Sequence, residues 1–184
     1  MRANVLFSLC VVLAALSAQV HAGERETFLQ KIYLSFCVKH LESFAGLREQ
    51  LVAQELPRLP AQQAVNFLDG QPGDVWPIPF KGAFGQYVLA LPEGDQSCHV
   101  MARGGESRVN RGWFARMAEQ APAPLIATPL EDDRVESPLT GEASRLSWQW
   151  ATEHAPRRLV LSLLTAEHEA APIQARVSLS IDDR

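Results

Sequence analysis

The sequence has no run of basic residues and no excess of positive charge, because 17 Lys and Arg stand against 21 Asp and Glu. Proteins that bind nucleic acid do so largely through Lys and Arg contacts to phosphate. We therefore expect no nucleic acid among its partners. The sequence also lacks a second long apolar segment after the one near its N-terminus, and a helix that spans a bilayer needs roughly 20 apolar residues. We expect no transmembrane segment in the rest of the chain.

Motifs of common catalytic sites are missing as well. The nearest approach to Gly-x-Ser-x-Gly is the segment GGES at residues 104–107, where a helix N-cap explains Ser107 better than a nucleophile does. Neither a glycine-rich phosphate loop nor a Cys-x-x-Cys-His haem motif occurs. The acidic pairs at 132–133 and 182–183 fall in a charged loop and at the chain end, where solvated charge is the ordinary explanation. We assign no catalytic residue, no metal ligand and no cofactor.

The first 22 residues have the three parts of a secretory signal. Arg2 supplies a positive charge, residues 5–16 form an apolar run, and Ala22 is a small residue at the expected cut. The apolar run is shorter than a membrane-spanning helix requires, which favours cleavage. Residues 1–22 are thus a predicted signal peptide, and the mature protein is expected to be periplasmic. Cleavage removes one positive charge, so the net charge changes from −4 to −5.

Only two cysteines remain after cleavage, Cys37 and Cys98, because Cys10 leaves with the signal. An even cysteine count in an oxidising compartment is typical of a disulfide, and two cysteines allow only one pairing. Two alternatives use the same side chains. Cys37 and His40 are spaced to touch on a helix, as in an activated thiol nucleophile. Together with Cys98 and His99 they have the composition of a zinc site, although neighbouring strand residues point to opposite faces.

Hydrophobic periodicity predicts an α+β fold, with N-terminal helices packed on a mostly antiparallel sheet and a C-terminal antiparallel β meander. Residues 23–184 are expected to form a single domain, with a possible sub-boundary near 121–124 at the segment APAP. The predicted helices cover residues 24–44, 47–56, 60–68 and 107–120, the last with Val109, Trp113 and Met117 facing inward. The predicted strands cover 86–91, 97–103, 125–128, 146–150, 158–165 and 173–181, and residues 131–136 are expected to be a flexible charged loop.

Trp76 belongs to a segment that is expected to lie at a sheet edge or over it, because Pro77 and Pro79 cannot donate in a sheet centre. Loops on a rigid scaffold often carry binding residues, so Trp76, Ile78 and Phe80 form a candidate contact patch. The alternative is that this segment closes the end of the core. The other three tryptophans occupy core-type positions, and residues 98, 100 and 102 are expected to face the first helix, opposite 99, 101 and 103.

The run from Phe67 to Trp76, followed by residues 85–91 and Cys98 and preceded by Cys37 and His40, resembles a group of small exported proteins of Gram-negative bacteria that are known mainly as uncharacterised. This resemblance implies a periplasmic location and carries over no catalytic residue.

Three functions follow as hypotheses. The first is a non-catalytic periplasmic protein-binding domain, an inhibitor or immunity-type partner of another envelope protein. The second is a small-molecule or envelope-glycan binding protein that uses the Trp76 segment. The third is a hydrolase in which a histidine meets a carboxylate, with His40, His99, His154 and His168 as candidates.

Overall fold

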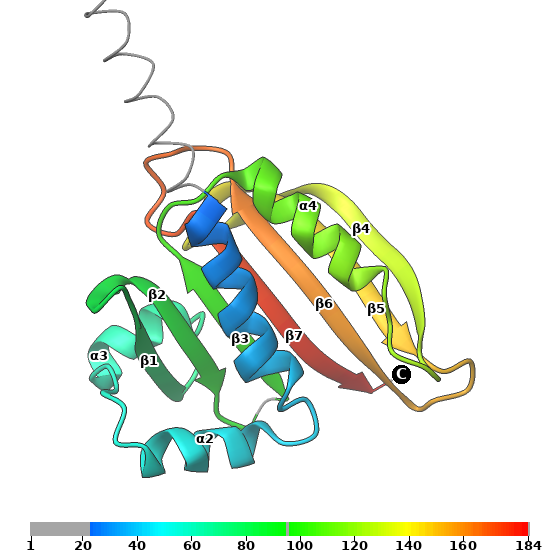
Figure 1. Ribbon diagram of the computed structural model, residues 1–184, viewed down its shortest axis with the longest axis horizontal. Coiled ribbons are helices and arrows are strands. Elements are labelled where there is room, and N and C mark those ends of the chain that lie inside the picture. Colours follow the sequence, from blue (N-terminus) through cyan, green and yellow to red (C-terminus); the bar gives the residue numbers. More distant parts are fainter. Residues whose placement is uncertain (1–22, 95, 184) are drawn as a thin grey trace, which may run out of the picture.

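The computed structural model describes residues 23–94 and 96–183. The predicted signal peptide lies outside the described residues. The fold is α+β, as predicted from the sequence, and its strands form one antiparallel sheet in the order β1-β2-β3-β7-β6-β5-β4 (Figure 1). The strands are β1 (Gly73–Phe80), β2 (Ala83–Pro92), β3 (Ser97–Ala102), β4 (Ile126–Ser137), β5 (Gly141–Ala151), β6 (Arg157–Ala166) and β7 (Ala175–Asp183).

Two meanders meet at the centre of this sheet. The first consists of β1, β2 and β3 and the second of β4 to β7, and β7 pairs with β3, for example Cys98 opposite Leu179. The helix α4 (Ser107–Ala118) connects the two meanders. The possible sub-boundary predicted near residues 121–124 falls in the chain between α4 and β4. The sheet is continuous from one meander to the other, because β3 pairs with β7.

The N-terminal helix covers one face of the sheet together with α4 (Figure 1). Its residues 23–33 are α-helical and continue into a π-helical turn, η1 (Leu34–Val38), so the helix ends before the predicted residue 44. After a turn, α2 (Phe44–Ala53) begins with Ser43 as its N-cap, whose Oγ accepts a hydrogen bond from the Gly46 N–H at 2.9 Å. Within the described residues no helix has the length and apolarity needed to cross a membrane.

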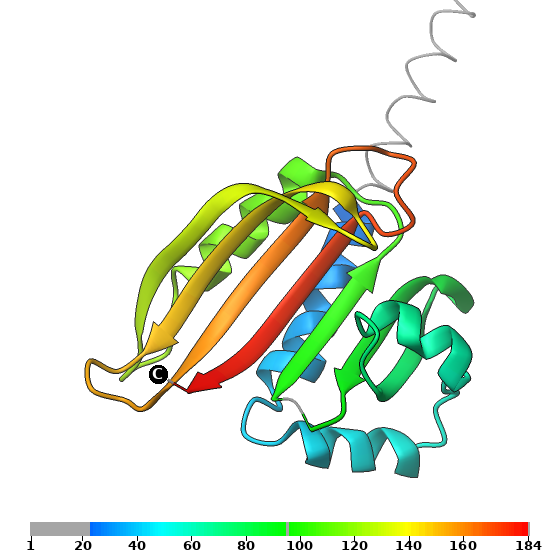
Figure 2. The same cartoon turned by 180° about the vertical axis from the view of Figure 1, so that it is seen from behind.

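The opposite face is covered only over the first meander. The short helices α3 (Ala61–Ala64) and η2 (Val65–Phe67) pack there and form a second apolar cluster with side chains from β1, β2 and β3 (Figure 2). Alternation along β3 behaves as predicted, because Cys98, Val100 and Ala102 belong to the main core and Met101 belongs to the second cluster. Over β4 to β7 no helix from residues 23–94 or 96–183 covers this second face (Figure 2).

The two ends of the sheet differ in how they are protected. At one edge, β1 carries Pro77 and Pro79, as predicted for an edge segment. At the other edge, residues 131–136 belong to β4, so the predicted flexible charged loop is wrong there. These residues pair with β5, for example Asp133 with Arg145. The strand is exposed on both faces, and its charged side chains therefore show no alternation that a sequence pattern can detect.

The inward face of α4 also differs from the prediction at one position. Trp113 is buried and Met117 is partly buried, but Val109 is 40 % exposed, and Asn110 and Phe114 are buried in its place. The predicted N-cap is wrong as well, since Glu106 occupies the cap position and the Ser107 hydroxyl donates to the Ala166 carbonyl.

Candidate functional site

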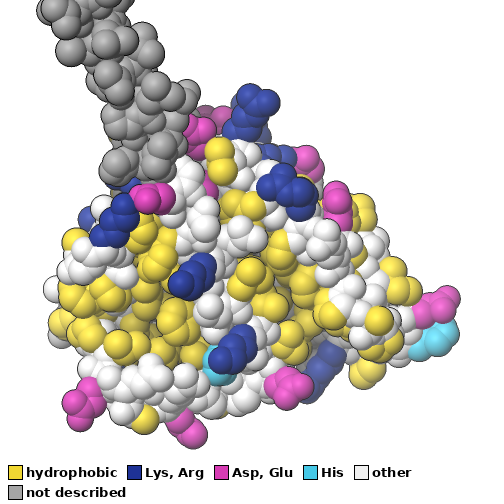
Figure 3. Space-filling model, viewed as in Figure 1, with side chains coloured by type: hydrophobic (Ala, Val, Ile, Leu, Met, Phe, Trp, Pro, Cys, Tyr) yellow, Lys and Arg dark blue, Asp and Glu magenta, His cyan; other side chains and the backbone are white. Residues whose placement is uncertain are grey.

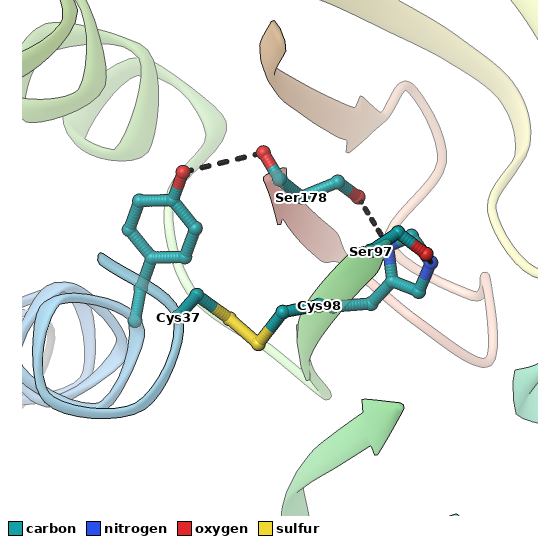
Figure 4. The surroundings of a disulfide bond; sticks show 6 residues. Cys37, Ser97, Cys98 and Ser178 are labelled. Carbon is teal, nitrogen blue, oxygen red and sulfur yellow. Dashed lines mark hydrogen bonds between the residues drawn. A yellow bond between two sulfur atoms is a disulfide. The ribbon is translucent and has the colours of Figure 1, made fainter. Parts of the chain in front are cut away.

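Cys37 and Cys98 form a disulfide. Cys37 in η1 and Cys98 in β3 have Cα atoms 5.5 Å apart, and both residues are fully buried (Figure 4). This bond is the one predicted from the cysteine count, and it fixes the N-terminal helix to the centre of the sheet. A nucleophile or a zinc ligand requires a thiolate. Sulfurs bonded to each other supply none, so the geometry supports neither a Cys37–His40 nucleophile nor a zinc site.

The candidate contact patch at Trp76, Ile78 and Phe80 is not a surface. Trp76 is 0 % exposed and Ile78 is 6 % exposed, and both lie in the main core. The reason is their register with β2, in which Trp76 pairs with Leu89 and Ile78 with Tyr87. All four side chains belong to the main core, which includes the N-terminal helix. Phe80 is partly buried against Phe28, with ring centroids 4.9 Å apart. The structure thus agrees with the alternative that this segment closes the core.

Among the histidines proposed as candidates, His99 lies between two serine hydroxyl groups, those of Ser97 and Ser178. Its Nδ1 lies 2.8 Å from the Ser178 Oγ and its Nε2 lies 3.2 Å from the Ser97 Oγ. Burial, together with a smaller contribution from the positive charge of Arg176, lowers the pKa of His99 to about 3. The imidazole is therefore neutral at physiological pH and a weak general base.

The surroundings of this histidine do not complete an acyl-transfer site. The group on the second ring nitrogen is a serine hydroxyl, where a catalytic triad places a carboxylate. Ser178 is in the middle of β7, paired with His99 of β3 on one side and with Ser162 of β6 on the other, so ladder hydrogen bonds surround it (Figure 4). We interpret His99 as a buried neutral side chain that joins β3 to β7.

The remaining histidines are not placed for acid–base work. His154 is exposed and His40 is partly exposed. His168 has a carboxylate neighbour, with its Nε2 4.0 Å from Glu142 Oε2, but both side chains are in solvent, where burial cannot tune a general acid.

The most distinctive exposed element is the edge strand β4. It is 12 residues long, and almost all of its residues are exposed or partly exposed. It has a neighbour, β5, on one side only. Its sequence contains four acidic residues and one basic residue, in the order Glu131, Asp132, Asp133, Arg134 and Glu136. An edge strand of this length presents a row of backbone donors and acceptors that a further strand can pair with.

Neighbouring arginines hold the acidic side chains of β4 in place. Arg145 of β5 makes two hydrogen bonds to the Asp133 carboxylate, at 2.8 and 2.9 Å, which lower the pKa of Asp133. Its Nη2 is also 3.2 Å from Glu131. On the other face, Arg111 of α4 pairs with Asp132 at 2.7 Å. The Asp132 side chain is nevertheless 65 % exposed, so its negative charge faces solvent.

The helix-bearing face of the molecule has no comparable grouping. Figure 3 shows acidic and basic side chains interspersed there with hydrophobic areas, with no continuous region of one charge. The candidate site is therefore β4, whose residues 131–136 were predicted to be a loop. In the sequence, the run of acidic residues was the one indication of this site.

Comparisons with protein-family models, with curated proteins and with solved structures give no match. The resemblance to small exported proteins of Gram-negative bacteria therefore stays a prediction, and the proposals below rest on the geometry of the chain.

Proposed function

We propose that this chain is a non-catalytic binding protein of the periplasm, an inhibitor or immunity-type partner that takes up an extended basic segment of another envelope protein along β4. The observation that carries the proposal is the long, exposed and acidic edge strand. Adding a strand to such an edge is a common mode of peptide recognition, in which main-chain hydrogen bonds provide affinity and side chains provide specificity.

Charge on β4 favours one kind of occupant over another. Two copies of this chain that paired edge to edge would bring acidic side chains opposite acidic side chains, which is destabilising. Pro129 and the irregular register between Pro129 and Asp132 also interrupt a continuous edge. A segment rich in Lys and Arg meets complementary charge instead. The acidic charge therefore disfavours self-association and favours a basic partner, whereas Pro129 and the irregular register limit strand pairing at that end of β4 for any occupant.

The location of the protein is part of this proposal. Its supports are the signal-like sequence of residues 1–22 and the buried disulfide, which is stable in an oxidising compartment. A second candidate function, small-molecule binding, is favoured by a cavity described in the next subsection.

Affinity capture with a matched pair of charge variants tests the proposal. The mature chain, Asp132→Lys/Glu136→Lys and the control Glu153→Lys/Glu169→Lys are immobilised and exposed to periplasmic extract. Glu153 and Glu169 are exposed outside β4, so both variants change the net charge equally. We expect a basic protein to be retained by the mature chain and the control, at least ~10-fold less by the β4 variant, and to be released by salt as screening increases.

Two results would contradict the proposal. One is that no specific protein is retained by the mature chain. The other is that both variants retain the same protein equally, because capture would then not depend on β4. Circular dichroism of each variant establishes that it is folded, since exposed ion pairs such as Arg111–Asp132 contribute at most about 1 kcal/mol.

A further inference from the structure

A cavity of about 390 Å³ lies on the second face of the sheet, between α3 with η2 and the strands β1 and β2. It is built from segments far apart in the sequence, which include η2, β2, the end of β3 and the loops that follow β4 and β6. Figure 2 shows α3 and the loop between β6 and β7 on this side of the molecule. The volume falls within the range of about 300 to 1,000 Å³ that is usual for small-molecule sites.

The walls of the cavity are mainly apolar. Val88 and Ile173 are buried members of the second apolar cluster, and Leu59, Phe67 and Leu139 are partly buried against that cluster. These last three side chains thus complete the cluster on one side and line the cavity on the other. An apolar wall of this kind gains free energy when an apolar ligand displaces water from it.

The charge at the cavity comes from Arg103. Among the described residues no Asp or Glu lines the cavity, and Arg103 is the one charged lining residue. Arg103 forms no ion pair with a carboxylate of the described residues, unlike Arg48, Arg145 and Arg176. Its guanidinium therefore offers a cationic fork beside an apolar wall.

The backbone of Arg103 is held beside the cavity, and the residue is exposed. Its backbone N–H donates to the Gln86 carbonyl at 2.8 Å, which extends the β2–β3 ladder by one position. Gln86 and Arg103 lie on the same face of the sheet as Val88 and Met101, because strand residues alternate between faces. Gln63, Asn66 and Gln86 also line the cavity, and their side chains carry neutral hydrogen-bonding groups.

We propose that this cavity binds a small carboxylate with an apolar body, such as a medium-chain fatty acid, with the carboxylate at Arg103 and the apolar part against Phe67, Leu139 and Ile173. A guanidinium matches a carboxylate in a bidentate geometry. A cavity with one unpaired cation, no acidic residue and apolar walls fits an amphipathic anion better than a sugar, which would need many polar partners, or a cation. This site is separate from β4 and its ligand is of a different class from the proposed protein partner.

Decanoate is the probe, and binding to the mature chain is measured by titration calorimetry at low salt. Decan-1-ol and decylamine have the same chain without the negative charge. We expect saturable binding of decanoate and at least ~10-fold weaker binding of the two other compounds. Arg103→Gln should weaken decanoate binding ~10-fold, as the loss of a charge-assisted hydrogen bond implies, and should leave the weak binding of decanol unchanged.

Two further variants make the test specific. Leu139→Trp fills the cavity and should weaken decanoate and decanol alike. Arg108→Gln is the matched control, because Arg108 is an exposed arginine on α4 that does not line the cavity, and it should change nothing. Absence of saturable decanoate binding, equal binding of decanol, or equal effects of the Arg103 and Arg108 variants would overturn the proposal. The β4 variant Asp132→Lys/Glu136→Lys should bind decanoate normally, so failure of one proposal leaves the other standing.

Discussion

Removing the Cys37–Cys98 disulfide should lower the free energy of unfolding by about 4 kcal/mol. The two cysteines are 61 residues apart in the sequence, and closing a loop of this length restricts the unfolded chain by that amount in the chain-entropy model. With an m-value of about 2 kcal/mol/M, the urea midpoint of Cys37→Ala/Cys98→Ala should fall by roughly 2 M. A domain of ordinary stability, about 10 kcal/mol, would still fold cooperatively.

The assay is urea unfolding of residues 23–184, followed by tryptophan fluorescence and by circular dichroism. The matched control is the wild-type chain unfolded and refolded under reducing conditions, in which only the sulfur–sulfur bond is lost. Its midpoint should fall close to that of the double alanine variant, and the difference between the two measures the packing of the sulfur atoms. A loss below about 1 kcal/mol with an unchanged m-value would refute the reasoning, because the bond would then not constrain the unfolded chain.

Three other residues give further predictions. His99 has a pKa of about 3 in the folded protein, below its ordinary value of 6.5. Between these two pH values the unfolded state binds more protons than the folded state. The free energy of unfolding should therefore fall by up to about 1.4 kcal/mol per pH unit as the pH drops from 6.5 towards 3. In His99→Asn this fall should be smaller than in the exposed-site control His154→Asn, as urea midpoints at pH 7, 5.5 and 4.5 would show. Glu26 is a buried carboxylate whose Oε1 accepts a hydrogen bond from the Glu106 N–H, 2.6 Å away at the start of α4; Glu26→Ala should cost about 1 to 3 kcal/mol and Glu26→Gln clearly less, because the amide oxygen can still accept. If the two variants are equally unstable in thermal unfolding, the hydrogen bond between Glu26 and the Glu106 N–H does not stabilise the fold. Trp76→Ala should cost roughly 3 to 5 kcal/mol, the usual cost of truncating a buried aromatic side chain, and a value near zero would contradict its burial in the core.

Much of the fold follows from local patterns in the sequence. Two cysteines remain if residues 1–22 are cleaved as predicted, they allow a single pairing, and the structure forms it. The prolines at 77 and 79 exclude a central strand, and β1 is an edge strand. Alternation in the segment 98–102 predicted which side chains face the helix, and the two apolar clusters confirm that assignment. In each case one chemical property of a few neighbouring residues is enough.

Features that depend on distant residues could not be predicted in this way. Trp76 is buried because β2 and the helices above it supply the rest of its surroundings, and nothing in the sequence near Trp76 reports their position. His99 meets Ser178, which lies 79 residues further along the chain. The cavity at Arg103 is formed by segments whose proximity depends on the strand order.

Only the first part of β4 was predicted, as a strand at residues 125–128, and its charged remainder was missed for a different reason. A strand that is half-buried alternates between apolar and polar residues, whereas β4 is exposed on both faces and carries charge at successive positions. Its pairing is specified by β5, whose residues 146, 148 and 150 do show alternation. Charge at successive exposed positions therefore hides a strand from an argument based on alternation.

Site-specific photocrosslinking in living cells tests the role of β4 most directly. A photoreactive residue replaces Leu130, which is 40 % exposed on β4, and in a second strain replaces Val52, which is 49 % exposed on α2. We expect one discrete, heavier adduct containing a basic envelope protein at position 130 and none at position 52. No adduct at 130, or the same adduct at both positions, would contradict a partner that binds along this edge.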